Sequence, residues 1–497
     1  MTNPIIHKLI ESLSCGKSKG LGDKDSQDAV TRLARIYELA RNAMEYRAEH
    51  LVRCAAIGRI LRRQLIFNND ASKLTTELLQ EMRWAGYINE LTINNLDQEN
   101  FILILGNYLA IWNDTKLNKD WLVGLISAHL EDLLSQNTDY AQFTNFAFNV
   151  LRPRIEVDDP KLDLILYVAV DRVYSQSDEA GIAYHLYKLN PNHNIEETFS
   201  AYESAFKDKS LNIASAWVRK QMGPLVLLRD MYFNKPENFP IILEDKELFT
   251  IEAEKVLGEQ LLLTRQRMNT ATFRSLLYVF LTKMILGILI EMPLEILFRG
   301  HINYISLAIN LLVPVAIMWI IVANIHLPKK RDQEKLLART IEIVFTPDIP
   351  ANNWEVMTKL NRSFSWYKFG LFYLFYGLLF VAVFYFIYWL LSLIGFSFIS
   401  VLVFLFFLSV VTFFAYRIRQ ISSVYTYDPR GETSSVGWDV LTLPMVAVGD
   451  LVSRGVSQLN FLAFVFDFIL EAPFKLILGF MDSWGRFLSS KRDEIVG

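Results

Sequence analysis

The order of apolar and polar residues divides the chain into a front half of amphipathic segments and a rear part of long apolar runs. From Asp25 to about Phe67, apolar side chains recur at helical spacing without a proline, and the segments that follow up to Tyr232 repeat this pattern. No strand-like alternation interrupts them. The front half is therefore predicted to be all-α, as a compact bundle or, alternatively, as a helical repeat. The helix–turn–helix rhythm of 183–206 suits a repeat, but no second copy lies about 34 residues away.

The longest apolar run extends from Trp366 to Arg419 and has no Asp, Glu, Lys, Arg or His between Lys368 and Arg417. As one helix it would be more than twice as long as a hydrocarbon layer of roughly 30 Å is thick. The run is therefore predicted to form two membrane helices joined within 392–400, where Gly395 and three serines allow a turn. Two earlier apolar segments, 275–298 and 302–327, are predicted to be further spans.

Basic residues are distributed unevenly around these four predicted spans. The connection from 328 to 366 is rich in lysine and arginine, whereas the loops at 299–304 and 392–400 contain almost none. Positive residues close to the ends of membrane helices stay on the cytoplasmic side. The sequence therefore predicts a multi-pass protein of the cell membrane whose N- and C-termini are both cytoplasmic.

The domain organisation expected from the sequence follows this topology. A flexible N-terminus precedes a soluble helical domain and a helical connector, and a basic cytoplasmic loop separates two pairs of spans. In chain order the parts are 1–20, the helical domain 21–240, the connector 241–274, spans 275–298 and 302–327, the basic loop 328–366, spans 367–392 and 397–418, a polar loop 419–440 and a tail 441–497.

The tail has a narrow polar stripe on a broad apolar helix. On a helical wheel at about 100° per residue, its polar positions fall within an arc of about 100°. These positions are Asn460, Asp467, Glu471, Lys475, Asp482 and Arg486. A helix of this kind is expected to lie along the membrane interface, because burying three of these charges in a fifth span would cost several kcal/mol. A fifth span is the alternative.

Composition limits the classes of function. The 497 residues are 52% hydrophobic and 21% charged, which is the average of two unlike regions. A net charge of -3 gives no reason to expect a nucleic-acid partner. The only cysteines, Cys15 and Cys54, exclude a disulfide framework. The first twenty residues lack the features of a cleaved signal peptide.

Charged and polar residues inside the predicted spans are the main candidates for function. The first span contains Lys283, Glu291 and Glu295, and Asn310 on the second span is the expected polar neighbour of Lys283. Ionisable groups at membrane depth often line ion or solute paths. The alternatives are that the long lysine stem extends to the headgroups and that the acids lie at the water boundary. The sequence therefore offers these four residues as lining groups of a path.

No motif of the soluble region predicts catalysis or a cofactor. The Gly-Lys-Ser sequence at 16–18 lacks the first glycine and the preceding strand of a phosphate-binding loop. A metal site would need His185, His193, Glu196 and Glu197 to converge, and their spacing is not that of a known ligand set. Neither His129 with Asp132 nor Cys54 has the spacing of a nucleophile and base. We expect no enzyme, cofactor or metal.

Three arginines at the end of the first long helix form a basic group. Arg59, Arg62 and Arg63 lie beside the apolar Leu65 and Phe67. This face either meets anionic headgroups or an acidic partner, or is an ordinary solvated helix face.

Two functions fit the sequence as a whole. The first is a membrane-tethered scaffold or assembly module, in which the helical domain binds a protein partner while the spans lie in the lipid bilayer. The second is a component of a transporter or channel, which four spans would form only as a homo-oligomer. An interfacial lipid-modifying enzyme is a third idea, but no catalytic set supports it.

Overall fold

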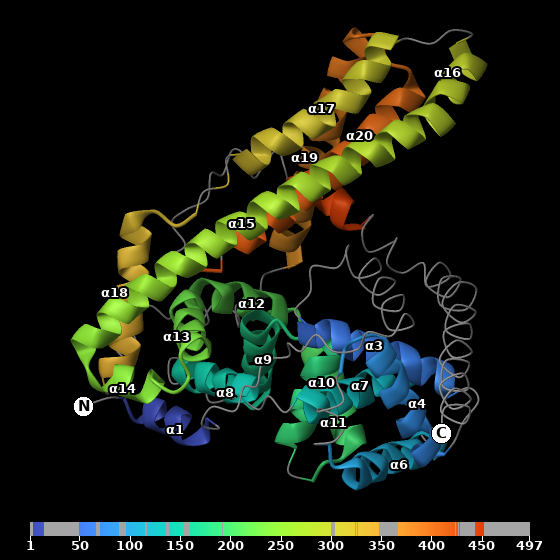
Figure 1. The fold of residues 1–497 in the computed structure, drawn as a ribbon. Coiled ribbons are helices and arrows are strands. Elements are labelled where there is room, and N and C mark those ends of the chain that lie inside the picture. The colour runs from blue at the N-terminus through green and yellow to red at the C-terminus, as the bar shows by residue number, and fades with distance from the viewer. Residues whose placement is uncertain are drawn as a thin grey trace, which may run out of the picture. The chain divides into compact units, whose positions relative to one another are not determined.

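The chain, in a computed structural model, is helical throughout the residues that the structure describes, and these contain no strand (Figure 1). The described residues are 3–13, 49–65, 70–88, 96–114, 117–135, 139–152, 160–190, 192–299, 304–323, 325, 327–346, 366–422, 424–425, 427 and 443–451. The prediction of an all-α chain is confirmed for them.

The chain divides into two compact units. The front unit comprises residues 4–218 and 461–497, and the rear unit comprises residues 1–3 and 219–460. The domain limits expected from the sequence stay predictions.

The front unit is built from short helices around one apolar core. Its core side chains come from α3, α4, α6, α7, α10 and α11 and include Ile57, Met82, Phe101 and Leu122. The described helices are α1 (Pro4–Ser12), α3 (Glu49–Gln64), α4 (Ala71–Trp84), α6 (Gln98–Asp114), α7 (Lys119–Ser135), α8 (Asp139–Leu151), α9 (Pro160–Val170), η2 (Asp171–Ser175), α10 (Glu179–Leu189), α11 (Ile195–Lys207) and α12 (Ser210–Gln221).

Polar residues immediately before these helices explain where several of them begin. Asp70 accepts from the backbone N–H of Ser72, Asp178 from that of Gly181 and Asn194 from that of Glu196, at 2.9 to 3.0 Å. Such caps satisfy amide groups that have no partner inside the helix and contribute about 1 kcal/mol each.

The rear unit combines polar and apolar helices. Its described elements are α13 (Gly223–Asn234), α14 (Phe239–Glu244), α15 (Lys246–Leu286), η3 (Gly287–Glu291), α16 (Met292–Arg299), α17 (Tyr304–Ala323), α18 (Lys330–Phe345), α19 (Trp366–Leu393), α20 (Phe398–Ser422) and a helix at 443–451.

The longest described helix, α15, packs with both the polar and the apolar helices of the rear unit. It is one uninterrupted helix of 41 residues, which corresponds to a length of about 60 Å. Its first half is charged and packs against α13, α14 and α18, while its second half is apolar and packs against α17 and α20. Most of the predicted connector and the first half of the predicted first span therefore lie in one continuous helix.

Three described helices are long and apolar enough to cross a membrane, fewer than the four spans that the sequence predicts. They are Lys246–Leu289, Tyr373–Leu393 and Ser400–Arg419. The difference lies in α17, whose described apolar part is the shorter segment Leu307–Ala323. A full crossing takes about 20 apolar residues. The coarser prediction of several membrane-type helices is confirmed, and the number four is too high by this criterion.

The turn between α19 and α20 lies where the sequence predicts it. Gly395 has a φ of 86°, and the N–H of Phe396 donates to the carbonyl of Leu391 at 3.3 Å. The N–H of Gly395 also donates to the carbonyl of Ser392 at 3.1 Å. This is the hydrogen-bond pattern of a Schellman motif, in which glycine takes the left-handed position at no steric cost. Ser397 then caps α20 by accepting from the N–H of Ser400.

After each apolar excursion the chain returns to the polar part of the rear unit. Following α17, α18 packs against α13 and α15, and the Phe345 ring lies 5.5 Å from that of Phe249 near the start of α15. The N-terminal segment joins the same body, because Asn3 donates to the carbonyls of Val344 at 2.9 Å and Thr346 at 3.1 Å. The start of the chain and the basic connector thus contact each other.

A single glycine allows the helix at 443–451 to approach α20. A Cβ atom added to Gly449 would lie 2.3 Å from the carbonyl oxygen of Ser409 and 2.6 Å from Cβ of Phe413. One turn earlier, the Ser409 hydroxyl lies 3.6 Å from Sδ of Met445. Only glycine fits at this crossing without a shift of backbone.

We expect Gly449→Ala to destabilise the protein by about 1 to 3 kcal/mol, because overpacking forces neighbouring helices apart. Thermal unfolding of the full-length protein in detergent measures the loss. Gly377→Ala on α19 is the matched control, since nothing lies within 4 Å of its added Cβ. Equal unfolding temperatures for the two variants would show that the 443–451 helix does not pack on α20.

Candidate functional sites

Lys283 is a buried cation in the described part of the apolar helices. It lies near the end of α15, and its side chain is 2% exposed. Its ammonium lies 4.7 Å from the ring centre of Phe407 and 5.4 Å from that of Phe404, both on α20. The side chain therefore points toward α20. A role in a path and a stem that extends to the headgroups both stay predictions.

The two aromatic rings explain how the apolar bundle accommodates this charge. A lysine at the centre of a membrane helix costs about 2.5 to 3.5 kcal/mol on insertion scales. A desolvated cation over an aromatic face gains up to about 2 kcal/mol. The free energy gained from two such contacts is of the same order as the cost of inserting the lysine. Phe404 and Phe407 of α20 therefore suit a lysine at position 283.

Asn310 is the second buried polar residue of these helices. It lies on α17 and is fully buried, and its neighbours Ile309 and Val313 pack in the same cluster as Phe404. The structure thus encloses Asn310 and Lys283 within one group formed by α15, α17 and α20. The prediction that the two residues contribute to one region of the bundle is consistent with this packing.

The other predicted path and stripe residues lie outside the described structure. Glu291 and Glu295 belong to η3 and α16, but their side chains are not described. The same holds for the whole tail stripe. Its residues are Asn460, Asp467, Glu471, Lys475, Asp482 and Arg486.

In the front unit, a buried carboxylate joins two helices. Asp171 is fully buried at the start of the π-helical turn η2, and its Oδ2 lies 2.7 Å from Nδ1 of His185 on α10. Its Oδ1 accepts from the hydroxyl of Ser177 at 2.7 Å. Between them Gln176 has a φ of 55°. The Asp171 carboxylate thus holds the strained turn and α10 together.

Burial lowers the pKa of His185, but the charge and hydrogen bond of Asp171 outweigh it and raise the pKa above its usual value. The Asp132 carboxylate acts in the same direction, whereas Lys188 opposes it. The pair therefore favours a protonated imidazole in the folded protein.

A second cluster surrounds His129 on α7. Its Nδ1 lies 2.9 Å from the Tyr108 hydroxyl, and its ring stacks on that of Tyr184 at 4.8 Å. Burial lowers the pKa of His129 to about 4, so it is neutral at pH 7. Asp132 accepts from Tyr184 at 2.7 Å and from Lys188 at 3.1 Å. The carboxylate therefore binds Tyr184 and Lys188.

These described polar groups of the front unit contact one another and join its helices. Among the described residues, no group of three or more His, Cys, Asp or Glu side chains could hold a metal ion. His185 binds Asp171, while His193 lies in a turn with its Nδ1 3.2 Å from the Tyr187 carbonyl. Cys54 is buried and unoxidised. The Gly-Lys-Ser sequence and Cys15 lie outside the described residues.

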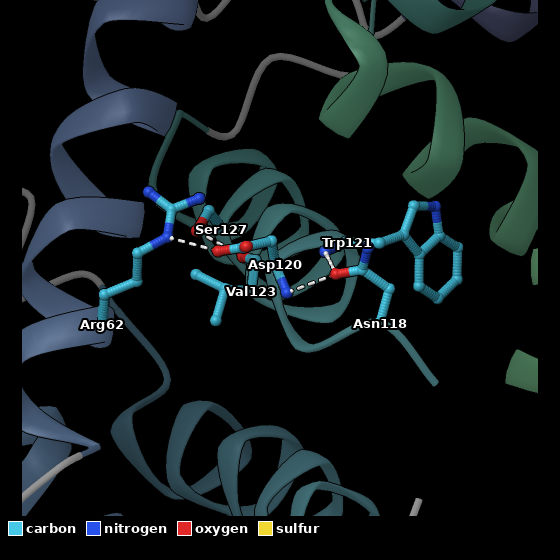
Figure 2. A network of polar contacts seen from close by, with 6 residues as sticks. All are labelled: Arg62, Asn118, Asp120, Trp121, Val123 and Ser127. Atoms are coloured by element: carbon cyan, nitrogen blue, oxygen red, sulfur yellow. Dashed lines mark hydrogen bonds and ion pairs between the residues drawn. The ribbon is translucent and has the colours of Figure 1, made fainter. Parts of the chain in front are cut away.

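The basic group at the end of α3 binds acids of its own unit. Arg62 pairs with Asp120 at 3.3 Å, and Asn118 accepts from the N–H of Asp120 as the cap of α7 (Figure 2). Arg63 pairs with Glu81, with only 16% and 10% of the two side chains exposed. Two of the three arginines are thus engaged inside the front unit. The interpretation of the group as a face for headgroups or an acidic partner stays a prediction.

In the rear unit, a polar contact joins the segment just after α20 to α13 and α15. Tyr425 is buried, and its hydroxyl donates to Asp230 on α13 and lies 3.4 Å from Oε1 of Gln260 on α15. Burial raises the pKa of Asp230, although Arg229 opposes this. The end of α20 is thereby fixed to the polar half of α15. No sequence pattern pointed to Tyr425 or Asp230, which are 195 residues apart.

Comparison with known proteins gives no family for this chain. No protein-family model, no curated protein and no solved structure matches it significantly. Its function must be inferred from the geometry described above.

We expect His185→Asn to destabilise the front unit by about 3 kcal/mol at pH 6, at the low end for a buried pair because the His185 side chain is 23% exposed. The raised pKa means that this stabilisation is complete below about pH 6.5 and is lost as the pH rises through the folded-state pKa. Hydrogen exchange of α10 in the full-length protein, at pH 6 and pH 9 and corrected for intrinsic rates, measures both effects.

His193→Asn is the control for this experiment, because that side chain lies in an exposed turn. Its Nδ1 lies by the Tyr187 carbonyl in the last turn of α10, so the substitution should leave exchange of 181–186 and the pH dependence there unchanged. If His185→Asn kept the wild-type dependence above pH 6.5, the pair with Asp171 would not be the cause.

Proposed function

We propose that this chain is an integral membrane protein whose helical front half is a membrane-tethered interaction and assembly module in the cytoplasm. The observation that carries the proposal is the continuity of α15. Its first half packs against α13, α14 and α18, which are called the polar body here, and its second half is an apolar membrane-type helix without a break. A domain attached in this way stays close to the bilayer, where it can hold a protein partner.

The returns of the chain to the polar helices of the rear unit support the same sidedness for the N-terminal segment, the α18 region and the chain just after α20. The N-terminal Asn3, the basic helix α18 and Tyr425 after α20 all contact α13, α15 or α18. If each apolar excursion leaves and re-enters at the same end of α15, the number of crossings is even, and the shorter α17 crosses together with the three longer helices. The positive residues of the α18 region favour the cytoplasm for that end.

The polar pairs and the exposed apolar side chains in the described part of the front unit support a binding domain. In its described part, the histidines and acids are engaged in structural pairs, and none forms a nucleophile with a base. Large apolar side chains are exposed on its surface and on the polar half of α15. Leu103 is 62% exposed and Ile251 is 65% exposed. These positions offer contact area to a partner.

Photo-crosslinking groups placed at Leu103 or Ile251 of the full-length protein should each give an adduct of defined mass in sealed native vesicles. Phe249, fully buried on the same helix as Ile251, is the control position and should give none. A membrane-impermeant thiol reagent should label a cysteine at Lys335 from the side on which the adduct forms. Absence of an adduct at both exposed positions, or labelling from the opposite side, would contradict the proposal.

The second candidate is a transporter or channel component, and the burial of Lys283 favours it. Ionisable side chains within membrane helices often mark ion or solute paths, and Lys283 is buried against α20. Asn310 on the facing helix would be a further lining group. With so few spans, a path would need a homo-oligomer.

Under this candidate, Lys283→Met should lower the potential-driven proton or ion flux of reconstituted vesicles at least about tenfold, because one charge in a narrow path changes the barrier by more than about 1.4 kcal/mol. Lys255→Met on the exposed polar half of α15 is the control and should leave flux unchanged. No flux with the wild-type protein, or equal flux with Lys283→Met, would exclude the transport function.

A further inference from the structure

Exposed cations gather where the apolar helices of the rear unit meet its polar body. They come from α15, from the start of α18 with the residue before it, and from the end of α20. The group, called the cationic belt here, consists of Arg265, Arg267, Lys329, Lys330, Arg331, Arg417 and Arg419. We propose that the cationic belt binds the headgroups of anionic phospholipids in the leaflet facing the polar body.

One apolar cluster brings these cations to the same part of the unit. Met268 on α15, Val322 on α17 and Ile418 on α20 pack together in it. Arg267 and Arg417 immediately precede two of these residues. Lys329 follows four residues after Ile325, which packs on the same cluster. The belt therefore surrounds one end of the apolar bundle and is not scattered along it.

The apolar surface beyond the belt determines where the lipid lies. On the side of the belt away from the polar body, large apolar side chains of α15 and α17 face outward, including Phe273, Leu277 and Leu312. A surface of this kind is covered by acyl chains. The headgroups of those lipids then come next to the belt, about one or two helical turns toward the polar body.

The charge balance of this region favours anionic headgroups. Asp332 and Glu334 in the first turns of α18 are the acids next to its basic start, and Asp332 lies 4.0 Å from Lys335. Tyr425 is buried nearby and donates to the half-buried Asp230, an acid that also interacts with the belt cation Arg267. The seven cations of the belt thus exceed the acids beside them. Arg417 also stacks on the Phe413 ring, which holds its charge at the surface of α20.

The experiment compares spin-labelled phosphatidylglycerol with spin-labelled phosphatidylcholine, each added to the full-length protein in phosphatidylcholine vesicles. The motionally restricted fraction gives the relative association of each lipid with the protein. The test variant neutralises four belt positions, Arg265→Gln, Lys330→Gln, Arg331→Gln and Arg417→Gln. Each cation near a membrane surface contributes about 1 kcal/mol, or about fivefold, so we expect the wild-type preference for phosphatidylglycerol to fall at least about fivefold in this variant.

The matched control neutralises four exposed cations of the same unit that lie away from the belt. These are Arg219→Gln, Lys220→Gln, Lys246→Gln and Lys255→Gln. The net charge then changes equally in both variants, and the control should keep the wild-type preference. A preference lost equally in both variants would assign it to overall charge and overturn the proposal. A wild-type protein without any preference would overturn it too, and would leave an acidic protein as the partner of the belt.

The proposal rests on the membrane embedding of the apolar helices, and the same experiment separates the two. Restricted phosphatidylcholine reports contact of acyl chains with those helices, whatever the headgroup. If phosphatidylcholine is restricted without a preference for phosphatidylglycerol, the cationic belt does not bind anionic headgroups, but the apolar helices are embedded in lipid. If neither lipid is restricted, the embedding itself is wrong.

Discussion

Close contact among α15, α17 and α20 is the constraint on which the rest of the rear unit depends. In lipid, apolar helices gain little from hiding apolar surface, so they associate through tight van der Waals packing and buried polar groups. Ala271 and Ala415 in the shared cluster have the small side chains that this requires. Because the three helices enclose Lys283 and Asn310, the same packing determines where charge and polarity can exist inside the bundle.

Local signals made the helices and the hairpin predictable. Apolar periodicity predicted an all-α chain, and Gly395 with its flanking serines located the turn between two apolar helices. The environment of Lys283 was not predictable, because the rings over its ammonium are more than a hundred residues away in the sequence. The link between Asp171 and His185 was hidden for another reason. It depends on a π-helical turn and a left-handed residue, which no periodicity indicates.

Several charged side chains of the front unit pair with charges of the same unit. The arginines of α3 are paired with acids of α4 and α7, and the two buried histidine clusters respond to pH in opposite directions. The lowered pKa of His129 makes acid destabilising, while the raised pKa of His185 makes base destabilising. A sequence shows such residues only as scattered polar positions in helices, since their partners are fixed by tertiary contacts.

The uninterrupted course of α15 has a mechanical consequence. Its polar half extends about 30 Å from the cluster around Met268, at about 1.5 Å per residue. A stiff helix of that length acts as a lever, so a tilt of about 10° at the bundle would displace its far end by about 5 Å. Since α13, α14 and α18 are packed on that arm, they would swing with it. Small rearrangements among the apolar helices would thus be amplified at the polar end.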